Sequence, residues 1–164
     1  MICDKLHECC SGENHACANR KQCVVFKDCR KNAVCEERNK RYNLVNEEGH
    51  MIALYHMDGG IISGEPNVQK CDFVYIVYDT KDPTSIFVER KGKDVYHAVR
   101  QIKETVDRYG LALQRRICVR IICSAVPRLY NDPSIKNLRK ELMKRYNGTL
   151  KIFEKNKDEK YSEL

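Results

Sequence analysis

The residues of this sequence that could do chemistry concentrate on one predicted β-hairpin. Residues 71–79 and 85–91 are rich in β-branched and aromatic side chains, and segment 80–84 between them has the composition of a turn. An antiparallel hairpin is therefore predicted. It brings Asp72, at the start of the first strand, close to Glu89, near the end of the second.

Three side chains at this point have the types that metal-dependent hydrolysis of a phosphodiester needs. Side chains alternate across a strand, so Glu89 and Lys91 share one face and Arg90 points to the other. Carboxylates such as those of Asp72 and Glu89 suit Mg²⁺ or Mn²⁺. A lysine beside them could orient or deprotonate a water, or stabilise charge on a phosphate. The hairpin therefore predicts a hydrolytic site.

The elements around the hairpin predict an α/β core. Apolar residues recur on one stripe of the predicted helix at 93–109, and the apolar run at 117–124 is typical of a buried strand. Ser134 is a plausible cap for a second helix. The predicted order is strand, strand, strand, helix, strand, helix, strand, over residues 50–57, 71–79, 85–91, 93–109, 117–124, 134–146 and 149–155.

This arrangement resembles the PD-(D/E)XK nuclease superfamily, the fold of restriction endonucleases and many repair nucleases. Asp72 matches the motif Asp, and Glu89-Arg90-Lys91 matches the (D/E)XK triplet. Residues 51–122 are similar to a largely uncharacterised bacterial group of the superfamily. That group carries the motifs DG, CD and ELKG and a helical Gln in this order, and the present sequence reads DGGII…CDF…FVERKG…HAVRQI. Arg90 departs from the group, where an apolar residue is usual.

The resemblance implies a restriction-endonuclease-like fold, with a mixed central sheet flanked by helices, and a Mg²⁺- or Mn²⁺-dependent nuclease acting on DNA or RNA. Asp72, Glu89 and Lys91 would be catalytic, and Gln101 falls where related nucleases often place a polar residue that points at the metal-bound water or the phosphate. Asp58 would be a second metal carboxylate, or it would cap the Asp-Gly-Gly turn.

Arg90, Lys93 and Arg100 are the predicted nucleic-acid contacts. Arg90 should meet the helix expected on the far face of its strand, unless that face is partly open or the strand turns enough to offer Arg90 to phosphate. A third alternative is that Arg90 replaced a neutral residue and perturbs the site.

The first 35 residues differ from the rest, because they hold seven of the ten cysteines and few apolar residues. Something other than hydrophobic burial must stabilise them, so we predict a small Cys-rich module at 1–35, a core at 36–155 and a charged, frayed tail at 156–164. A structural Zn²⁺ is predicted, and disulfides, an iron–sulfur cluster and free thiols stay open because the spacing is not CxxC. The candidate ligands are Cys3, Cys9, Cys10, Cys17, Cys23, Cys29 and Cys35.

Residues 31–48 are consistent with a helix that leads into the core. Its Glu36, Glu37 or Glu47 could supply a further carboxylate near the metal, as a first-helix Glu does in some members of the superfamily. A solvated helical face is the interpretation we favour for each of the three.

Composition is that of a globular protein, with 42% hydrophobic and 32% charged residues. The net charge of +7 fits a polyanionic partner such as DNA or RNA without identifying it. No run approaches the roughly 18 apolar residues that span a bilayer, and the N-terminus lacks a signal-peptide pattern, so we expect a cytoplasmic protein with no membrane partner. The sequence leaves the oligomeric state open, a homodimer included.

A catalytically inactive adaptor on the same fold, binding nucleic acid or protein, is the alternative function. The intact set of Asp72, Glu89 and Lys91 favours the enzyme. A protein kept only for binding would have no physical reason to hold two carboxylates near phosphates without a cation.

Overall fold

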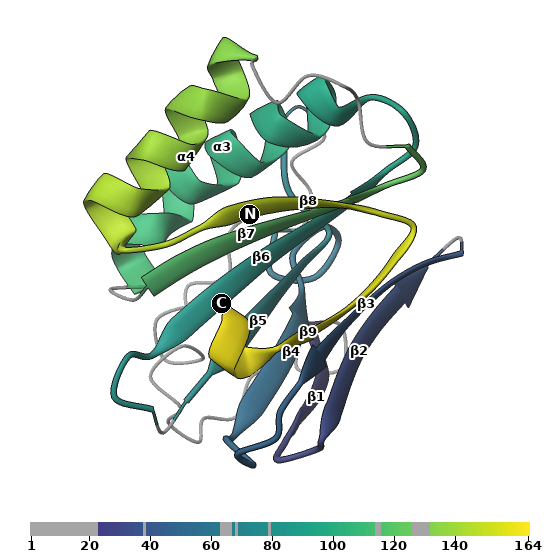
Figure 1. The fold of residues 1–164 in the computed structure, drawn as a ribbon, viewed down its shortest axis with the longest axis vertical. Coiled ribbons are helices and arrows are strands. Elements are labelled where there is room, and N and C mark those ends of the chain that lie inside the picture. Colours follow the sequence, from purple (N-terminus) through teal and green to yellow (C-terminus); the bar gives the residue numbers. More distant parts are fainter. Residues whose placement is uncertain are drawn as a thin grey trace.

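A mixed sheet of six strands, in the order β1-β4-β5-β6-β7-β8, forms the centre of the structure (Figure 1). The structure is a computed structural model and describes residues 23–37, 39–62, 67, 69–78, 80–113, 116–125 and 132–164. Strands β1 and β4–β6 pair antiparallel, whereas β6, β7 and β8 pair parallel. The strands are β1 (Val24–Asp28), β4 (Ile52–His56), β5 (Phe73–Val77), β6 (Thr84–Lys91), β7 (Arg116–Cys123) and β8 (Leu150–Glu154).

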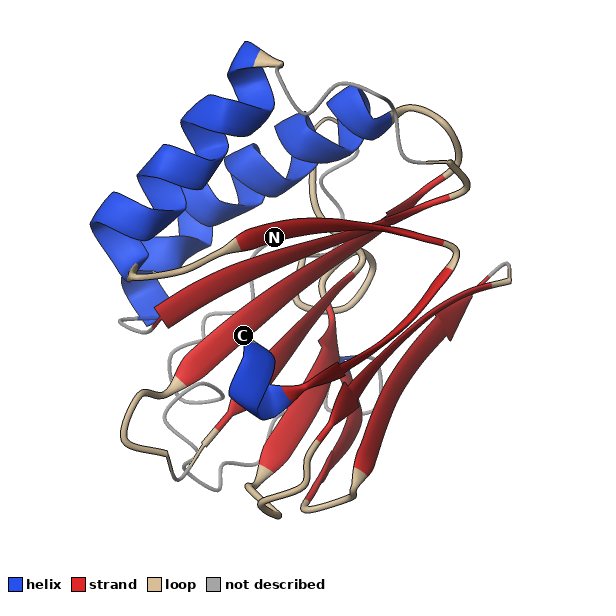
Figure 2. Ribbon diagram, in the orientation of Figure 1, coloured by secondary structure: helices blue, strands red, loops and turns tan. Residues whose placement is uncertain are grey.

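Helices α3 (Val95–Leu113) and α4 (Pro133–Tyr146) cover one face of this sheet (Figure 2). Each helix connects two parallel neighbours, as crossover connections between parallel strands require. The predicted apolar stripe of α3 is buried against the sheet. Asp132, rather than Ser134, caps α4, because its carboxylate accepts hydrogen bonds from the backbone amides of Ser134 and Ile135.

A second sheet of three strands covers the opposite face of the first. It contains β2 (Asn32–Glu37), β3 (Lys40–Val45) and β9 (Asn156–Lys160), with β2 antiparallel and β9 parallel to β3. Apolar residues therefore form two cores, one under the helices and one between the sheets. In the second core the Tyr75 hydroxyl of β5 donates a hydrogen bond to the Ala33 carbonyl of β2 at 3.0 Å, which ties the sheets together.

The helix predicted over residues 31–48 is wrong, because β2 and β3 form a hairpin there. The buried apolar residues, Ala33 and Cys35 on β2 and Tyr42 and Leu44 on β3, follow the two-residue period of a strand. Asn39, at the turn, has a φ of 61°, a left-handed conformation that Asn tolerates.

The tail predicted to fray instead forms β9 and a short 3-10 helix, η1 (Tyr161–Glu163). Glu159 explains why a charged segment is ordered. Its side chain is 1% exposed, and Arg120 of β7 donates a hydrogen bond to it at 2.6 Å. The charge of Glu159 is thus neutralised inside the protein, whereas Asp158 and Lys160 stay exposed.

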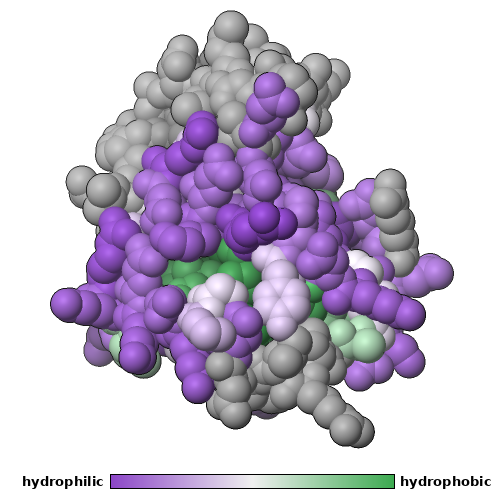
Figure 3. Space-filling view, turned by 90° about the horizontal axis from the view of Figure 1, so that it is seen from above, coloured by the Kyte–Doolittle hydropathy of each residue, from purple (hydrophilic) through white to green (hydrophobic). Residues whose placement is uncertain are grey.

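The α/β class and the order of the seven elements predicted from residue 50 to residue 155 are confirmed. The predicted boundary at residue 35 falls within β2; β1 joins the six-stranded sheet and β2 the three-stranded one, whereas residues 1–22 of the predicted module lie outside the described residues. The surface seen in Figure 3 is mostly hydrophilic, with hydrophobic residues showing mainly in one hollow near its centre. Within the described ranges, no helix is long and apolar enough to cross a membrane.

Candidate functional site

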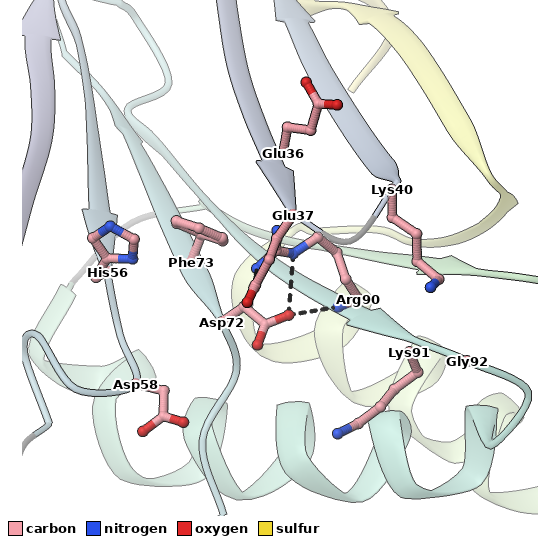
Figure 4. A pocket seen from close by; sticks show the side chains of 10 residues that line it. All are labelled: Glu36, Glu37, Lys40, His56, Asp58, Asp72, Phe73, Arg90, Lys91 and Gly92. Atoms are coloured by element: carbon pink, nitrogen blue, oxygen red, sulfur yellow. Dashed lines mark hydrogen bonds and ion pairs between the residues drawn. The ribbon is translucent and has the colours of Figure 1, made fainter.

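A pocket of about 550 Å³ lies where the ends of β4, β5 and β6 meet the tip of the β2–β3 hairpin (Figure 4). The hairpin contributes Glu36, Glu37 and Lys40 to its lining. The remaining lining residues come from the six-stranded sheet and the turns that follow its strands. They are His56, Asp58, Asp72, Phe73, Arg90, Lys91 and Gly92.

Asp72 lies directly before β5 and is held by Arg90 of β6. One carboxylate oxygen, Oδ2, accepts hydrogen bonds from the Arg90 backbone amide at 2.9 Å and from its Nε at 3.2 Å. The other oxygen, Oδ1, accepts no hydrogen bond from any residue that the structure describes. Arg90 therefore fixes the orientation of Asp72 and leaves one of its oxygens open.

The guanidinium of Arg90 has further partners between the two sheets. It forms an ion pair with Glu37 of β2 at 2.5 Å and lies 4.4 Å from the centroid of the Phe73 ring. Only 4% of the Arg90 side chain is exposed. The charge of Arg90 already faces two carboxylates and little of it reaches solvent, so its predicted contact with nucleic acid stays a prediction that this geometry does not favour.

Glu89 precedes the lining residues Arg90 and Lys91 on β6; its own side chain is fully buried and does not line the pocket. Lys91 Nζ is 3.2 Å from its Oε1, but neither carboxylate oxygen receives a well-directed hydrogen bond from the described residues. Burial, together with the nearby charge of Asp72, raises the pKa of Glu89 to about 8, and Lys91 opposes the rise only in part. A carboxyl group is rarely removed from water to this extent unless hydrogen bonds or an ion pair offset the full cost of its burial.

Asp58 reaches the same pocket from the turn after β4. The Met57 amide donates a hydrogen bond to the Asp72 carbonyl at 2.9 Å, so the two segments run side by side as predicted. In Figure 4, Asp58 and Lys91 extend into the space beside Asp72 from opposite sides. Asp58 is exposed and forms an ion pair with Lys70 at 3.1 Å.

Gln101 and Thr105 of α3 hold the backbone just before Asp72. Gln101 Nε2 donates a hydrogen bond to the Lys70 carbonyl at 2.9 Å, and Thr105 Oγ1 accepts one from the Cys71 amide at 3.1 Å. Gln101 does not line the pocket, and its predicted role toward a metal-bound water or a phosphate stays a prediction. It acts on the segment that carries Asp72.

Asp72 and Glu89 are the residues of this site that could hold a divalent cation. Glu89 would bring two buried oxygens, of which Oε1 already pairs with Lys91 at 3.2 Å, and Asp72 would bring Oδ1. Mg²⁺ is commonly bound by one or two carboxylates, with waters and substrate phosphates completing its shell. No group of three or more His, Cys, Asp or Glu residues suited to a metal occurs within the part of the chain that the structure covers, so the fit rests on these two carboxylates.

Lys93 and Arg100 are exposed, as surface contacts with nucleic acid would require. Arg100 lines a separate shallow depression on α3, together with Lys103 and Glu104. Neither Lys93 nor Arg100 lines the pocket over Asp72.

The predicted zinc ligands are only partly within the described residues. Cys3, Cys9, Cys10 and Cys17 lie outside them. Cys23 is buried in the core under the helices, Cys35 is buried in the core between the sheets, and Cys29 is exposed, so the structure does not bring these three together. The zinc site therefore stays a prediction. Cys71, Cys118 and Cys123 are buried.

Sequence reasoning did not single out Lys40, His56 or Phe73, and it placed Glu37 on a helix. A signal was available for His56, because it ends an apolar strand two residues before Asp58. The roles of Glu37 and Lys40 depend on the second sheet, whose position no local pattern indicates.

The sequence matches no protein-family model, and no curated protein is significantly similar to it.

Proposed function

We propose that this protein is a metal-dependent nuclease that hydrolyses phosphodiester bonds of DNA or RNA. The observation that carries the proposal is the carboxyl of Glu89, fully buried beside Asp72 and Lys91 without a well-directed hydrogen bond. Burying such a group is costly, and Lys91 at 3.2 Å compensates the cost only in part, since the pKa of Glu89 stays raised. A purely structural core would be more stable with an apolar residue there.

The order of the elements supports the same proposal. Strands β4, β5 and β6 form an antiparallel meander, and α3 then leads to β7, which is parallel to β6. Asp72 stands at the start of the middle strand, and Glu89 and Lys91 at the end of the third. This is the order that the resemblance to the PD-(D/E)XK superfamily implies around its site.

Each residue of the site has a role that its position allows. Asp72 and Glu89 would hold Mg²⁺ or Mn²⁺, which when bound supplies positive charge to the scissile phosphate and acidity to a bound water. Lys91 would orient the attacking water or stabilise charge on the phosphate, since its ammonium group lies at the pocket and 28% of its side chain is exposed. Asp58 would assist from the opposite side of the pocket.

Cleavage assays test this proposal. Single- and double-stranded DNA and RNA are incubated with Mg²⁺, Mn²⁺ or a chelator, using the parent protein, Glu89→Gln and Lys91→Ala. We expect cleavage only with a divalent ion and at least a hundredfold loss in both variants, which is roughly the scale of a lost transition-state interaction. Lys81→Ala is the matched control, because Lys81 lies in the turn at the other end of β6. Equal rates for Lys91→Ala and the parent would refute the assignment.

The alternative function is an inactive binding protein on the same fold, and Arg90 is the observation that favours it. Its guanidinium already supplies Asp72 with the positive charge that a metal would otherwise provide. Calorimetric titration with Mn²⁺ separates the two functions. Retained binding of nucleic acid, with neither Mn²⁺ binding nor cleavage, would favour the adaptor.

A cytoplasmic location, a homodimer and a structural Zn²⁺ stay predictions from the sequence.

A further inference from the structure

The pocket over Asp72 is walled by two different sheets. The tip of the β2–β3 hairpin forms one wall and the ends of β4–β6 form the other, and the ion pair between Arg90 and Glu37 joins them. A volume of about 550 Å³ is within the usual range for a site that encloses one small molecule. It has room for one or two nucleotides but not for a stretch of duplex.

An aromatic surface is exposed in this pocket. His56 of β4 and Phe73 of β5 are directly paired across the two strands, and their ring centroids are 4.7 Å apart. Phe73 is itself buried and contacts the Arg90 guanidinium, whereas His56 is exposed and lines the pocket. The imidazole of His56 is therefore held in place from behind, so a base could stack on it with little loss of side-chain freedom.

Positive charge lies on the other side of Asp72. Figure 4 shows Lys40 and Lys91 on one side of this carboxylate and His56 with Phe73 on the other. Lys91 faces Glu89, and Lys40 forms no ion pair with a residue that the structure describes. One nucleotide could thus place its phosphate near the two lysines while its base reaches His56.

The hairpin wall disfavours a second strand. Glu36 and Glu37 lie at its tip, and Glu36, which is exposed, has no ion pair within the described part of the chain. Because Glu37 is already paired with Arg90, the repulsion comes from Glu36, and a complementary strand that brought further phosphates toward Glu36 would be disfavoured. Lys40 on the same wall attracts instead the phosphate of a single strand that enters toward Lys40 and Lys91.

We propose that the pocket binds one unpaired nucleotide, with its base on His56 and its phosphate toward Lys40 and Lys91, so that the substrate is a single-stranded nucleic acid. The cleavage of that substrate rests on the nuclease function proposed above, whereas its binding does not. The same stacking chemistry serves DNA and RNA, because every base has an aromatic face.

Fluorescence anisotropy with labelled oligonucleotides tests the binding. Single-stranded DNA, single-stranded RNA and the corresponding duplexes are titrated with the parent protein in Ca²⁺ and, separately, in a chelator. We expect at least one type of single strand to bind about tenfold more tightly than its duplex. His56→Ala should weaken single-strand binding roughly 5- to 100-fold, which is the worth of one stacked base, and His56→Phe should restore it. His97→Ala is the matched control, because His97 lies on α3, at the opposite face of the sheet.

Two results would overturn the proposal: duplex binding as tight as single-strand binding, or equal affinities for His56→Ala and the parent. Melting curves for both His56 variants establish that they are folded. Parallel cleavage assays with Mn²⁺ separate this proposal from the nuclease function. Single-strand binding that depends on His56, without cleavage, would refute the nuclease and support the binding site. Duplex cleavage that is indifferent to His56 would support the nuclease and refute this inference.

Discussion

Arg90 and Asp72 are joined twice, since the backbone amide and the side-chain Nε of Arg90 both donate to the same oxygen of Asp72. A divalent cation at Asp72 would therefore sit close to a guanidinium, which repels it. The same guanidinium also pairs with Glu37 on the second sheet. Arg90 thus limits the access of a metal to the proposed site and ties that site to the β2–β3 hairpin.

Replacing Arg90 by an apolar residue should strengthen metal binding. Arg90→Leu removes the positive charge from Asp72 but keeps the backbone hydrogen bond to Oδ2. We expect Mn²⁺ to bind about tenfold more tightly, which corresponds to the loss of one charge-assisted interaction of roughly 1.5 kcal/mol that competes with the metal. Calorimetric titration measures the change. Arg100→Leu, on the exposed face of α3, is the control, and weaker Mn²⁺ binding in Arg90→Leu would contradict the expectation.

The stability of the metal-free protein should fall as pH rises, because of Glu89. Burial raises the pKa of its carboxyl from 4.5 to about 8, so between these values the folded protein binds a proton that the unfolded chain has lost. The contribution of Glu89 to stability is therefore largest below pH 4.5, decreases up to pH 8 and is constant above it. The slope is at most about 1.4 kcal/mol per pH unit.

Urea denaturation at several pH values measures this effect against a variant that cannot ionise. Glu89→Gln keeps the shape of the side chain, so the difference in unfolding free energy between parent and variant isolates Glu89. Mn²⁺ should restore part of the lost stability near pH 8, because it binds the ionised form. A pH-independent difference between the two proteins would show that Glu89 ionises normally.

The fold of residues 50–155 could be predicted because each element carries its own pattern. Apolar residues alternate or run together in the strands, and they recur at helical spacing in α3. The β2–β3 hairpin was mistaken for a helix because Glu36, Glu37 and Lys40 at its tip hide the alternation of its buried residues. Strand β9, with the sequence NKDEK, has no apolar residue at all.

The part of the candidate site that could be predicted is the part that lies on the single hairpin of β5 and β6. Asp72, Glu89 and Lys91 were expected to converge, and the geometry of β5 and β6 brings them together. The contact between Arg90 and Glu37 could not be foreseen, because the two residues are 53 positions apart and belong to different sheets. What a local pattern cannot indicate is which element covers the far face of a sheet.

The buried pair of Arg120 and Glu159 should dominate the stability of β9. Burial would raise the pKa of Glu159, but hydrogen bonds from Arg120, Lys151 and Tyr42 lower it overall, so the carboxylate is ionised. Arg120→Ala would remove the buried cation beside a carboxylate that is 1% exposed and leave it to Lys151 and Tyr42, and we expect a loss of about 3–5 kcal/mol in unfolding free energy. Urea denaturation measures it. Asp158→Ala breaks a neighbouring exposed pair with Arg41 and should cost less than about 1 kcal/mol, and equal losses would contradict this distinction.

Thr105 should position Asp72 without touching the substrate. Its hydroxyl is fully buried, accepts a hydrogen bond from the Cys71 amide and donates one to the Gln101 carbonyl, so it fixes the backbone next to Asp72. Thr105→Val keeps the shape but leaves the amide unpaired, which should cost about 1–3 kcal/mol of stability. In an active nuclease we expect kcat to fall about tenfold with little change in KM. The reason is that a misplaced Asp72 reduces the stabilisation of the transition state more than it reduces the binding of the substrate.

Thr84→Val separates positioning from stability. Thr84 is also fully buried, and its hydroxyl donates a hydrogen bond to the Asp82 carbonyl in the turn at the opposite end of β6. Its loss should lower stability by a similar amount while kcat stays at the parental value. Mn²⁺ titration gives a second readout, since Thr105→Val should also weaken metal binding through Asp72 and Thr84→Val should not. If both variants lose activity in proportion to stability, Thr105 has only a structural role.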